Sequence, residues 1–315
     1  MPHVYAPHRS HSMQWTWATL AGPDARDFIQ RVTSADARNL AVGCGTRGCF
    51  LTPQGRLRAY FHLWRYGEDE FGFEFDAGDT GKWRDELFAA IDQFTFGEKM
   101  TLTPVTGLEC RWIFANTDSE LSELLQGLEP GQTRAIDEEI RLCHEGSIDF
   151  GRPWVTAWGR PARIEQWAER TVKFNSIDFN TIESWRVAAL RPRVDRELTE
   201  MTVPLEAGLT DAIAANKGCY PGQEVIEKIV SLGSPAKRLA LIAGEGDMPQ
   251  TAAPLWNVGE PATEVGNLTT VVKDGNGWRA LGYVRKNYAK PGLEVRINNA
   301  ASGKNGTLQK ISNYE

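Results

Sequence analysis

The chain has 315 residues, of which 41% are hydrophobic and 24% charged, a composition typical of a globular protein that we expect to fold as two or three domains. Its net charge of −6 and isoelectric point of about 5.6 argue against a globally basic surface, so we expect no direct nucleic-acid partner. No apolar run approaches the roughly 20 residues of a membrane-spanning helix, and residues 1–17 lack the apolar centre of a secretory signal. These features predict a cytoplasmic protein with no membrane partner. No segment indicates an oligomer interface, so we expect a monomer.

The cysteines are odd in number and widely spaced. They are Cys44, Cys49, Cys110, Cys143 and Cys219. No Cys-x-x-Cys pair occurs, and no cysteine–histidine cluster has the spacing of a zinc site. We therefore expect free thiols in a reducing compartment and no metal site.

The first half of the chain reads as mixed helix and strand. Hydrophobic periodicity and turn residues predict helices over 22–36, 79–96 and 118–128, and β structure over 48–75 and 99–116. Within 48–75 we expect strands at 50–51, 57–65 and 70–75. Asp79 or Thr80 is the expected cap of the second helix. This order of elements favours an α+β layer over a doubly wound sheet.

The second half begins helical and ends as short strands. Helices are predicted over 159–174, 180–192 and 209–218, the last with Thr210 as its cap and Gly218 just beyond its end. From Leu239 onward, short β runs separated by Gly, Asp and Asn predict a small barrel or sandwich. The segment 225–230 fits a helix by its apolar stripe and a strand by its β-branched residues, so its structure stays open.

The stretch "ANKGCYPGQEVIEKI", residues 215–229, places a thiol beside an ammonium group and then a rigid turn. Tyr220 to Gln223 has the composition of a type II turn, with Pro at the second position and Gly at the third. Lys217 would favour the thiolate of Cys219 if it lay within a few ångströms, whereas a helix end and Glu224 would oppose this. Cys219 is therefore either a reactive group or a small buried residue.

"KGCYPGQE" resembles the K-G-C-Y-x-G-Q-E signature of the YgfZ-like folate-binding proteins, relatives of the glycine-cleavage T-protein. Residues 20–36, 186–209 and 265–297 are similar to other parts of that family. The resemblance implies an α+β, three-domain, T-protein-like fold around a central channel, with a small C-terminal β-barrel. It implies a discontinuous first domain at 1–45 and 150–235, a second domain at 46–149 and a barrel at 236–315.

The resemblance also implies a cofactor, tetrahydrofolate or a one-carbon derivative, held in the channel. Glu206, in "PLEA", falls where the family places a carboxylate on the pterin, whose adjacent N–H groups suit two oxygens. Arg238 matches an arginine near the folate tail. Read without the family, Glu206 would be a solvated loop residue and Arg238 a strand-edge cation. Tyr220 and Gln223 of the signature are further cofactor-binding candidates.

Lys217 and Cys219 are the candidate functional pair that the resemblance assigns to the same channel. The T-protein carries an acidic pair in a G-G-x-x-D-D stretch, and one of these acids is essential to aminomethyl transfer. Here the matching stretch is "PQGRLRAYFHLW", with Ala59 and Tyr60 in place of the acids. The fold is thus expected to keep folate and lose that reaction, as in the YgfZ-like group.

Three functions follow as hypotheses. The first is a folate-binding accessory protein for assembly or maintenance of iron–sulfur enzymes, including those of tRNA modification, with such enzymes or cluster-assembly proteins as partners. The alternative is a tetrahydrofolate-dependent aminomethyl or methyl transferase or demethylase, in which Asp195 or Glu197 replaces the missing acid. A direct tRNA-binding module is the third, and the acidic isoelectric point argues against it.

Overall fold

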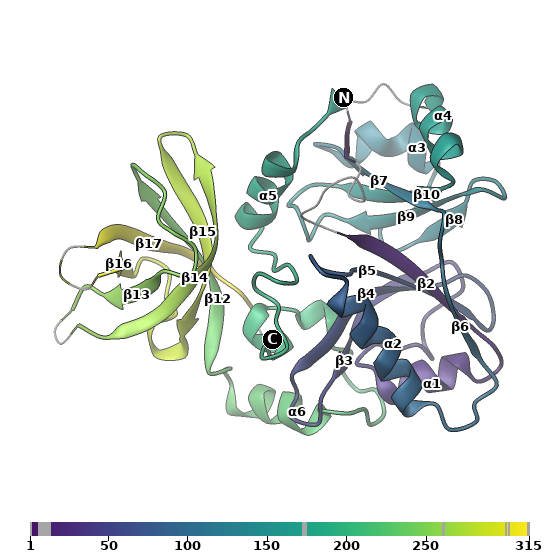
Figure 1. Ribbon diagram of the computed structural model, residues 1–315, viewed down its shortest axis with the longest axis horizontal. Helices are drawn as coiled ribbons and strands as arrows, with labels where there is room; N and C mark the ends of the chain where they lie inside the picture. The colour runs from purple at the N-terminus through teal and green to yellow at the C-terminus, as the bar shows by residue number, and fades with distance from the viewer. Residues whose placement is uncertain are drawn as a thin grey trace. The chain divides into compact units, whose positions relative to one another are not determined.

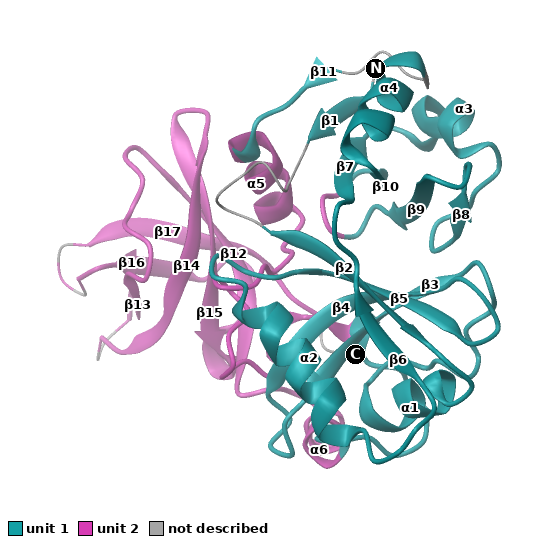
Figure 2. Cartoon of the chain, turned by 45° about the vertical axis from the view of Figure 1, so that its right-hand side comes forward, with its two compact units in different colours: residues 1–148, 152–179, 211–223 teal, residues 149–151, 180–210, 224–315 magenta. Residues whose placement is uncertain are grey.

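The computed structural model describes residues 2–5, 14–171, 175–259, 262–299, 301 and 303–313. The chain divides into two compact units, shown in different colours in Figure 2. Unit 1 holds residues 1–148, 152–179 and 211–223, and unit 2 holds residues 149–151, 180–210 and 224–315. The predicted three-domain boundaries and the central channel stay predictions.

The described residues of unit 1 form two mostly antiparallel sheets (Figure 1). The five-stranded sheet has the order β3 (Gly45–Leu51), β4 (Leu57–Arg65), β5 (Glu70–Asp76), β2 (Trp15–Ala21) and β6 (Thr101–Pro104). The six-stranded sheet has the order β11 (Asn175–Ser176), β1 (His3–Tyr5), β7 (Glu109–Phe114), β10 (Trp154–Gly159), β9 (Ile140–Gly146) and β8 (Thr133–Ala135). β1 and β11 pair in parallel.

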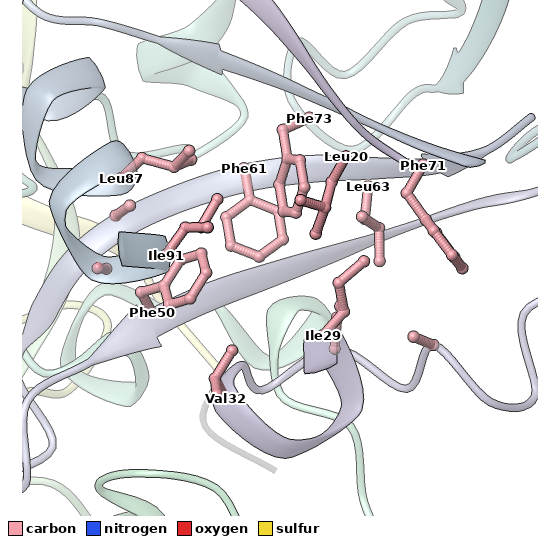
Figure 3. Close-up of a cluster of buried hydrophobic side chains, with 14 of the residues drawn as sticks. Leu20, Ile29, Val32, Phe50, Phe61, Leu63, Phe71, Phe73, Leu87 and Ile91 are labelled. Carbon is pink, nitrogen blue, oxygen red and sulfur yellow. The ribbon is translucent and has the colours of Figure 1, made fainter. Parts of the chain in front are cut away.

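One face of the five-stranded sheet packs on helices α1 (Ala25–Val32) and α2 (Lys82–Phe94), as Figure 3 shows. Phe61 and Phe73 from the sheet meet Ile29 of α1 and Leu87 of α2 in a fully buried core. Each such side chain contributes about 1.5–3 kcal/mol on burial. Because side chains alternate along a strand, the residues next to these phenylalanines, such as His62 and Glu74, point to the other face of the sheet.

That other face packs against the six-stranded sheet through tryptophans. Trp15 of β2 meets Trp112 of β7 edge to face, with ring centroids 5.1 Å apart. Trp17 meets Trp158 of β10 in the same way at 5.3 Å. Edge-to-face pairs of this kind stabilise beyond the area they bury. The high tryptophan content of the chain is therefore used largely to fill the space between two sheets.

The outer face of the six-stranded sheet is covered by α3 (Ser122–Leu125), which follows a 3₁₀ turn, η2 (Asp118–Leu121), and by α4 (Pro161–Thr171). Leu124 and Ile164 from these helices pack on Val155 of β10. Unit 1 is thus layered as helix, sheet, sheet and helix (Figure 1).

Unit 2 contains a closed six-stranded barrel among its described residues. Its strands run in the order β12 (Lys237–Glu245), β15 (Gly277–Arg285), β14 (Glu264–Asp274), β13 (Pro254–Asn257), β16 (Glu294–Ile297) and β17 (Lys304–Ile311). Trp278 fills the barrel and lies directly over Gly244, where an added Cβ would fall 2.3 Å from the ring. The remaining elements are α5 (Phe179–Ala188), α6 (Gln223–Leu232) and the 3₁₀ turns η3 (Pro204–Ala207), η4 (Thr210–Ala212) and η5 (Lys286–Tyr288).

The expected fold class is confirmed: the chain is mixed α and β and carries a small C-terminal barrel. The open segment 225–230 is helical, within α6. The expected helix over 209–218 is wrong, because only the turn η4 forms there and Asn216 has a φ of 57°. The N–H of Ala214 bonds the carbonyl of Ser34 instead of a helical partner.

The cap expected at Asp79 or Thr80 is also wrong. Gly81, in the left-handed region, precedes the first residue of α2, and no side chain caps it. In the part of the chain that the structure describes, no helix is both long enough and apolar enough to cross a membrane.

Candidate functional site

The Pro221–Gly222 segment forms the predicted type II turn. Gly222 has a φ of 83°, and the N–H of Gln223 donates to the carbonyl of Tyr220 at 3.2 Å. A Cβ on Gly222 would fall 2.5 Å from the carbonyl oxygen of Thr52. The turn therefore packs tightly against the loop between β3 and β4, and only glycine fits at its third position.

Lys217 is buried and binds the C-terminal end of α1. Its ammonium donates to the carbonyl of Thr33 and, at 2.6 Å, to that of Ala35, and it lies 5.1 Å from the centre of the Tyr220 ring. A cation suits this position because the last carbonyls of a helix carry partial negative charge. Burial lowers the pKa of Lys217 to about 8; nearby Asp36 opposes the shift and Arg38 adds to it.

Cys219 is exposed, whereas Cys49, Cys110 and Cys143 are buried and Cys44 is intermediate. The interpretation of Cys219 as a buried small residue is therefore wrong. It borders a surface hollow of about 430 Å³ together with Arg31 and Arg38. Arg31 pairs with Glu98, and Arg38 pairs with Asp27 at 3.1 Å. Asp24 lines the hollow as well, so the thiol lies among three carboxylates and two guanidinium groups.

Lys217 and Cys219, the candidate functional pair, therefore lie in different environments. The ammonium of Lys217 is directed at buried carbonyls, and the thiol of Cys219 lies at the surface. Their joint action stays a prediction. What the geometry establishes is that Lys217 fastens the signature segment to α1, and that the turn which follows holds Cys219 in place.

The other predicted cofactor residues lie in unit 2. Glu206, in η3, is buried, and its Oε2 lies 3.7 Å from the ammonium of Lys237. That ammonium sits 4.5 Å from the centre of the Tyr283 ring. Arg238, on β12, donates from Nε at 3.0 Å and from Nη2 to the carbonyl of Ser312. Glu206 is thus no solvated loop residue, and Arg238 contributes to the barrel itself.

Tyr220 and Gln223 complete the predicted set. Tyr220 is buried and faces Lys217, and Gln223 is the first residue of α6. The structure brings Lys217, Tyr220 and the signature turn together in unit 1, and Glu206 and Arg238 belong to unit 2. A single folate site that joins both sets stays a prediction.

Glu197, one of the two expected substitute acids (the other is Asp195), is held in a buried network of hydrogen bonds. It accepts from Arg186 at 2.9 Å and from the hydroxyls of Thr269 and Thr270, each at 2.6 Å. Arg186 also forms a bidentate pair with Glu183, at 2.9 Å for both bonds. These carboxylates raise the pKa of Arg186 above its usual range in spite of its burial. Removing one partner of such a buried cluster would cost about 3–5 kcal/mol.

The locally basic segment "LRPRVDRE", residues 190–197, has a largely structural use as well. Arg191 is buried and pairs with Asp149 at 2.8 Å, and Arg193 is buried beside Glu183, whereas Arg196 is exposed. Arginines that pair with buried carboxylates do not present a phosphate-binding surface. Two of the three arginines in this segment therefore give no support to the direct tRNA-binding hypothesis.

Sequence reasoning missed a polar cluster between the two sheets of unit 1: His62, Glu74, Glu145 and Thr156. His62 and Glu74 lie opposite each other on β4 and β5. Each lies between two apolar residues of its strand, Phe61 and Leu63 for His62 and Phe73 and Phe75 for Glu74, which was a signal that the second face of this sheet carries polar groups. Their meeting with Glu145 and Thr156 depends on sheet-to-sheet packing, for which the local sequence carries no signal.

Comparisons with known proteins show which structures and sequences this chain is similar to. The crystal structure of the glycine cleavage system aminomethyltransferase T from Bartonella henselae matches 98% of this chain and 85% of that one, with a TM-score of 0.83 at 17% identity. The tRNA-modifying protein YgfZ of Escherichia coli K12 is 21% identical over 307 residues, covering 91% of this chain and 88% of that protein. YgfZ of Photobacterium profundum is 22% identical over 250 residues, covering 73% of this chain and 68% of that protein.

A chloroplastic protein of Arabidopsis thaliana that is named as a transferase is 24% identical over 301 residues. The match covers 90% of this chain but 66% of the plant protein, so the chain spans just under two thirds of that relative. No protein-family model matches the chain.

The chain has the fold of the glycine-cleavage T-protein over nearly its whole length. Its matches to YgfZ proteins, together with the signature around Cys219, support a YgfZ-like protein with that fold.

Proposed function

We propose that this protein is a tetrahydrofolate-binding accessory protein that supports assembly or maintenance of iron–sulfur enzymes, including those that modify tRNA. The observation that carries the proposal is the exposed thiol of Cys219 on a turn of the YgfZ-like signature, in a chain with Ala59 and Tyr60 where the T-protein has its acids. The name of the YgfZ relatives, tRNA-modifying protein, supports the second part. We expect the protein to act as a cytoplasmic monomer.

The donor groups of the proposed folate site fit the cofactor. Glu206 is a buried carboxylate, and a buried carboxylate suits the adjacent N–H groups of a pterin edge. Arg238 would meet the glutamate tail through its guanidinium group. Tyr220 and Gln223 would contribute from the signature. Bound tetrahydrofolate would supply one-carbon carrying capacity.

Cys219 would supply the sulfur chemistry of the accessory function. As its thiolate, an accessible thiol can attack a disulfide of a partner, forming a mixed disulfide and releasing the other cysteine of that disulfide as a thiolate. Attack on the outer sulfur of a partner's persulfide would instead move that sulfur to Cys219 and leave the partner's cysteine as a thiolate. The proposed partners are iron–sulfur enzymes or the proteins that assemble their clusters. Lys217 would act on this chemistry indirectly, by fixing the segment that carries the thiol.

A tetrahydrofolate-dependent one-carbon transferase or demethylase is the second candidate. It is favoured by the transferase name of the plant relative. Two observations count against it: no acid stands at 59–60, and Glu197 is fully engaged by Arg186, Thr269 and Thr270. Formation of methylene-tetrahydrofolate from methylamine, sulfonium or aryl-ether donors would favour this candidate over the accessory protein.

Calorimetric titration with tetrahydrofolate tests the cofactor assignment. The wild type should bind, and Glu206→Ala should weaken binding by about tenfold or more, because a charged hydrogen bond contributes about 1.5–3 kcal/mol. Cys219→Ala should bind within about twofold of the wild type, since the thiol is not a folate ligand in this proposal.

Glu264→Ala, which removes an exposed carboxylate from the barrel of the same unit, is the matched control and should bind normally. Failure of the wild type to bind tetrahydrofolate would contradict the folate part of the proposal. Equal binding by Glu206→Ala would remove Glu206 from the site while leaving folate binding itself intact.

A further inference from the structure

Two adjacent cations on β12 of the barrel, Lys237 and Arg238, have different surroundings. Because side chains alternate along a strand, Arg238 shares the face of Ala240 and Ile242, which belong to the core inside the barrel. The guanidinium of Arg238 donates to the carbonyl of Ser312. Lys237 therefore points to the outer face of the barrel.

On this outer face the ammonium of Lys237 is supported by an aromatic ring. Tyr283 of β15 pairs with Leu239 of β12, which makes it the diagonal neighbour of Lys237. The ammonium lies 4.5 Å from the centre of the Tyr283 ring. The hydroxyl of Tyr283 donates to the carbonyl of Glu197 at 3.0 Å, so the far end of the ring is held as well. The ring therefore favours one position of the ammonium.

The same ammonium faces Glu206. The turn η3, which carries Glu206, packs against β12, and Glu206 Oε2 lies 3.7 Å from Nζ of Lys237. This distance is too long for a hydrogen bond, so the two groups attract each other without using up the N–H donors of the ammonium. The side chain of Glu206 is 11% exposed and that of Lys237 is 40% exposed. The pair thus presents an acceptor group and a donor group side by side, and solvent reaches the donor.

Such a pair is complementary to a ring edge on which N–H donors stand next to a carbonyl oxygen. A carboxylate only accepts hydrogen bonds, and an ammonium only donates them. The pterin edge that would suit Glu206 carries an amino group, a ring N–H and then a carbonyl oxygen. The carboxylate suits the first two groups, and the ammonium of Lys237 suits the third. A site built to bond such a group rejects an analogue that lacks it, so this contact would set specificity.

We propose that Lys237 is a specificity-determining residue of the folate site, and that it donates to the pterin carbonyl while Glu206 accepts from the neighbouring N–H groups. The inference rests on the proposed function and deepens it, because it names the group that recognises the ring oxygen. Recognition of the ring by this pair does not require the glutamate tail. Arg238, on the other face of β12, would not replace Lys237 in this contact.

The test titrates the full-length protein by calorimetry with tetrahydrofolate and with tetrahydropterin, which has the same ring but no glutamate tail. The wild type should bind both. Lys237→Met should weaken both by a similar factor, about fivefold or more, because the ring loses a charged donor. Lys237→Arg keeps a charged donor and should recover most of the affinity. Lys273→Met, which removes an exposed lysine from β14 of the same barrel, is the matched control and should bind normally.

Infrared difference spectroscopy gives a readout that a purely structural lysine would not change. The ligand is tetrahydropterin with a heavy oxygen isotope at the ring carbonyl, which identifies the carbonyl band. In the wild-type complex this band should lie at a lower frequency than in the Lys237→Met complex, because a charged donor weakens the carbonyl bond. The denaturant midpoint of Lys237→Met should stay close to that of the wild type, since the ion pair with Glu206 is partly exposed.

The outcomes separate this inference from the folate proposal on which it rests. Equal binding by the wild type and Lys237→Met, a loss confined to tetrahydrofolate, or an identical carbonyl band in the two complexes would each overturn the role of Lys237 and leave folate binding intact. Wild-type binding of tetrahydrofolate but not of tetrahydropterin would do the same. Binding of neither ligand by the wild type would overturn the folate proposal, and the role of Lys237 with it.

Discussion

The signature segment from Lys217 to Gln223 and the polar cluster of His62, Glu74, Glu145 and Thr156 lie in the same unit, and each contains a buried ionisable group whose pKa is about 8. Burial lowers the pKa of Lys217 to that value and raises the pKa of Glu74 to it. The ammonium of Lys217 donates to two backbone carbonyls, whereas Glu74 keeps its proton at neutral pH. The first arrangement fastens a loop, and the second lets two buried carboxyl groups lie close together between the sheets.

This difference indicates that the two regions serve different purposes. In the signature segment the buried charge is satisfied internally, and the functional atom, the thiol of Cys219, lies outside at the surface. In the polar cluster the carboxyl groups accept hydrogen bonds from neighbours inside the same layer, among them His62 and Thr156. The signature segment is thus a rigid support for an exposed group, and the polar cluster is a buried contact between two sheets.

The largest expected effect is the loss of stability when the buried ammonium of Lys217 is removed. Lys217→Met should lower the free energy of unfolding by about 2–4 kcal/mol, because the carbonyls of Thr33 and Ala35 lose a charged donor. Denaturant unfolding measures it. Lys228→Met, an exposed lysine on α6, is the matched control and should change stability by less than about 0.5 kcal/mol. Equal, small effects of both changes would show that Lys217 does not fasten the segment to α1.

A smaller effect is expected on the pH dependence of stability, through Glu74 in the polar cluster between the two sheets. Glu74 has a pKa of about 8 in the folded protein, against 4.5 as its ordinary value, so the folded state holds its proton more tightly. Between these two pH values, stability should fall by about 1.4 kcal/mol per pH unit as pH rises, and above pH 8 this contribution should be flat.

Glu74→Gln should abolish that slope, and the comparison of the two proteins across pH removes the contributions of other groups. The groups that face Glu74 are Glu145 and Cys143 from β9, Thr156 from β10, Trp15 from β2 and His62 from β4. Lys217 gives the opposite slope, a gain in stability between about pH 8 and 10.5, because there the unfolded chain holds the proton. Parallel stability curves for the wild type and Glu74→Gln would contradict the buried proton.

Local sequence signals predicted the parts of the fold that local physics decides. The strand over 57–65 has the predicted bounds, because its residues alternate in part between polar and apolar and turns stand at both ends. The turn at Tyr220–Gln223 was predictable because Pro and Gly each fix one backbone angle. The signature around Cys219 could be found for the same reason, since its residues are contiguous.

The rest depended on contacts between distant segments. The Ala-rich stretch 209–218 looked helical, yet Ser34 takes up the backbone N–H of Ala214 and only a short turn forms. Residues 51–67 contain no carboxylate, so the sequence predicted none near β4. In the structure, Glu145 of β9 is hydrogen-bonded to His62 of β4, and Glu74 of β5 lies opposite His62. The sequence likewise did not show whether Arg186 and Arg193 are buried or form a basic surface, because their burial depends on the folded barrel.

The most direct test of the account measures an iron–sulfur-dependent tRNA modification in cells that lack this protein. Wild type should restore the level of the modified nucleoside, whereas Cys219→Ala should fail to restore it although it accumulates to the same level. Cys44→Ala, which changes a half-buried thiol, should restore it fully. Full restoration by Cys219→Ala would contradict the claim that an exposed thiol on the signature turn carries the function.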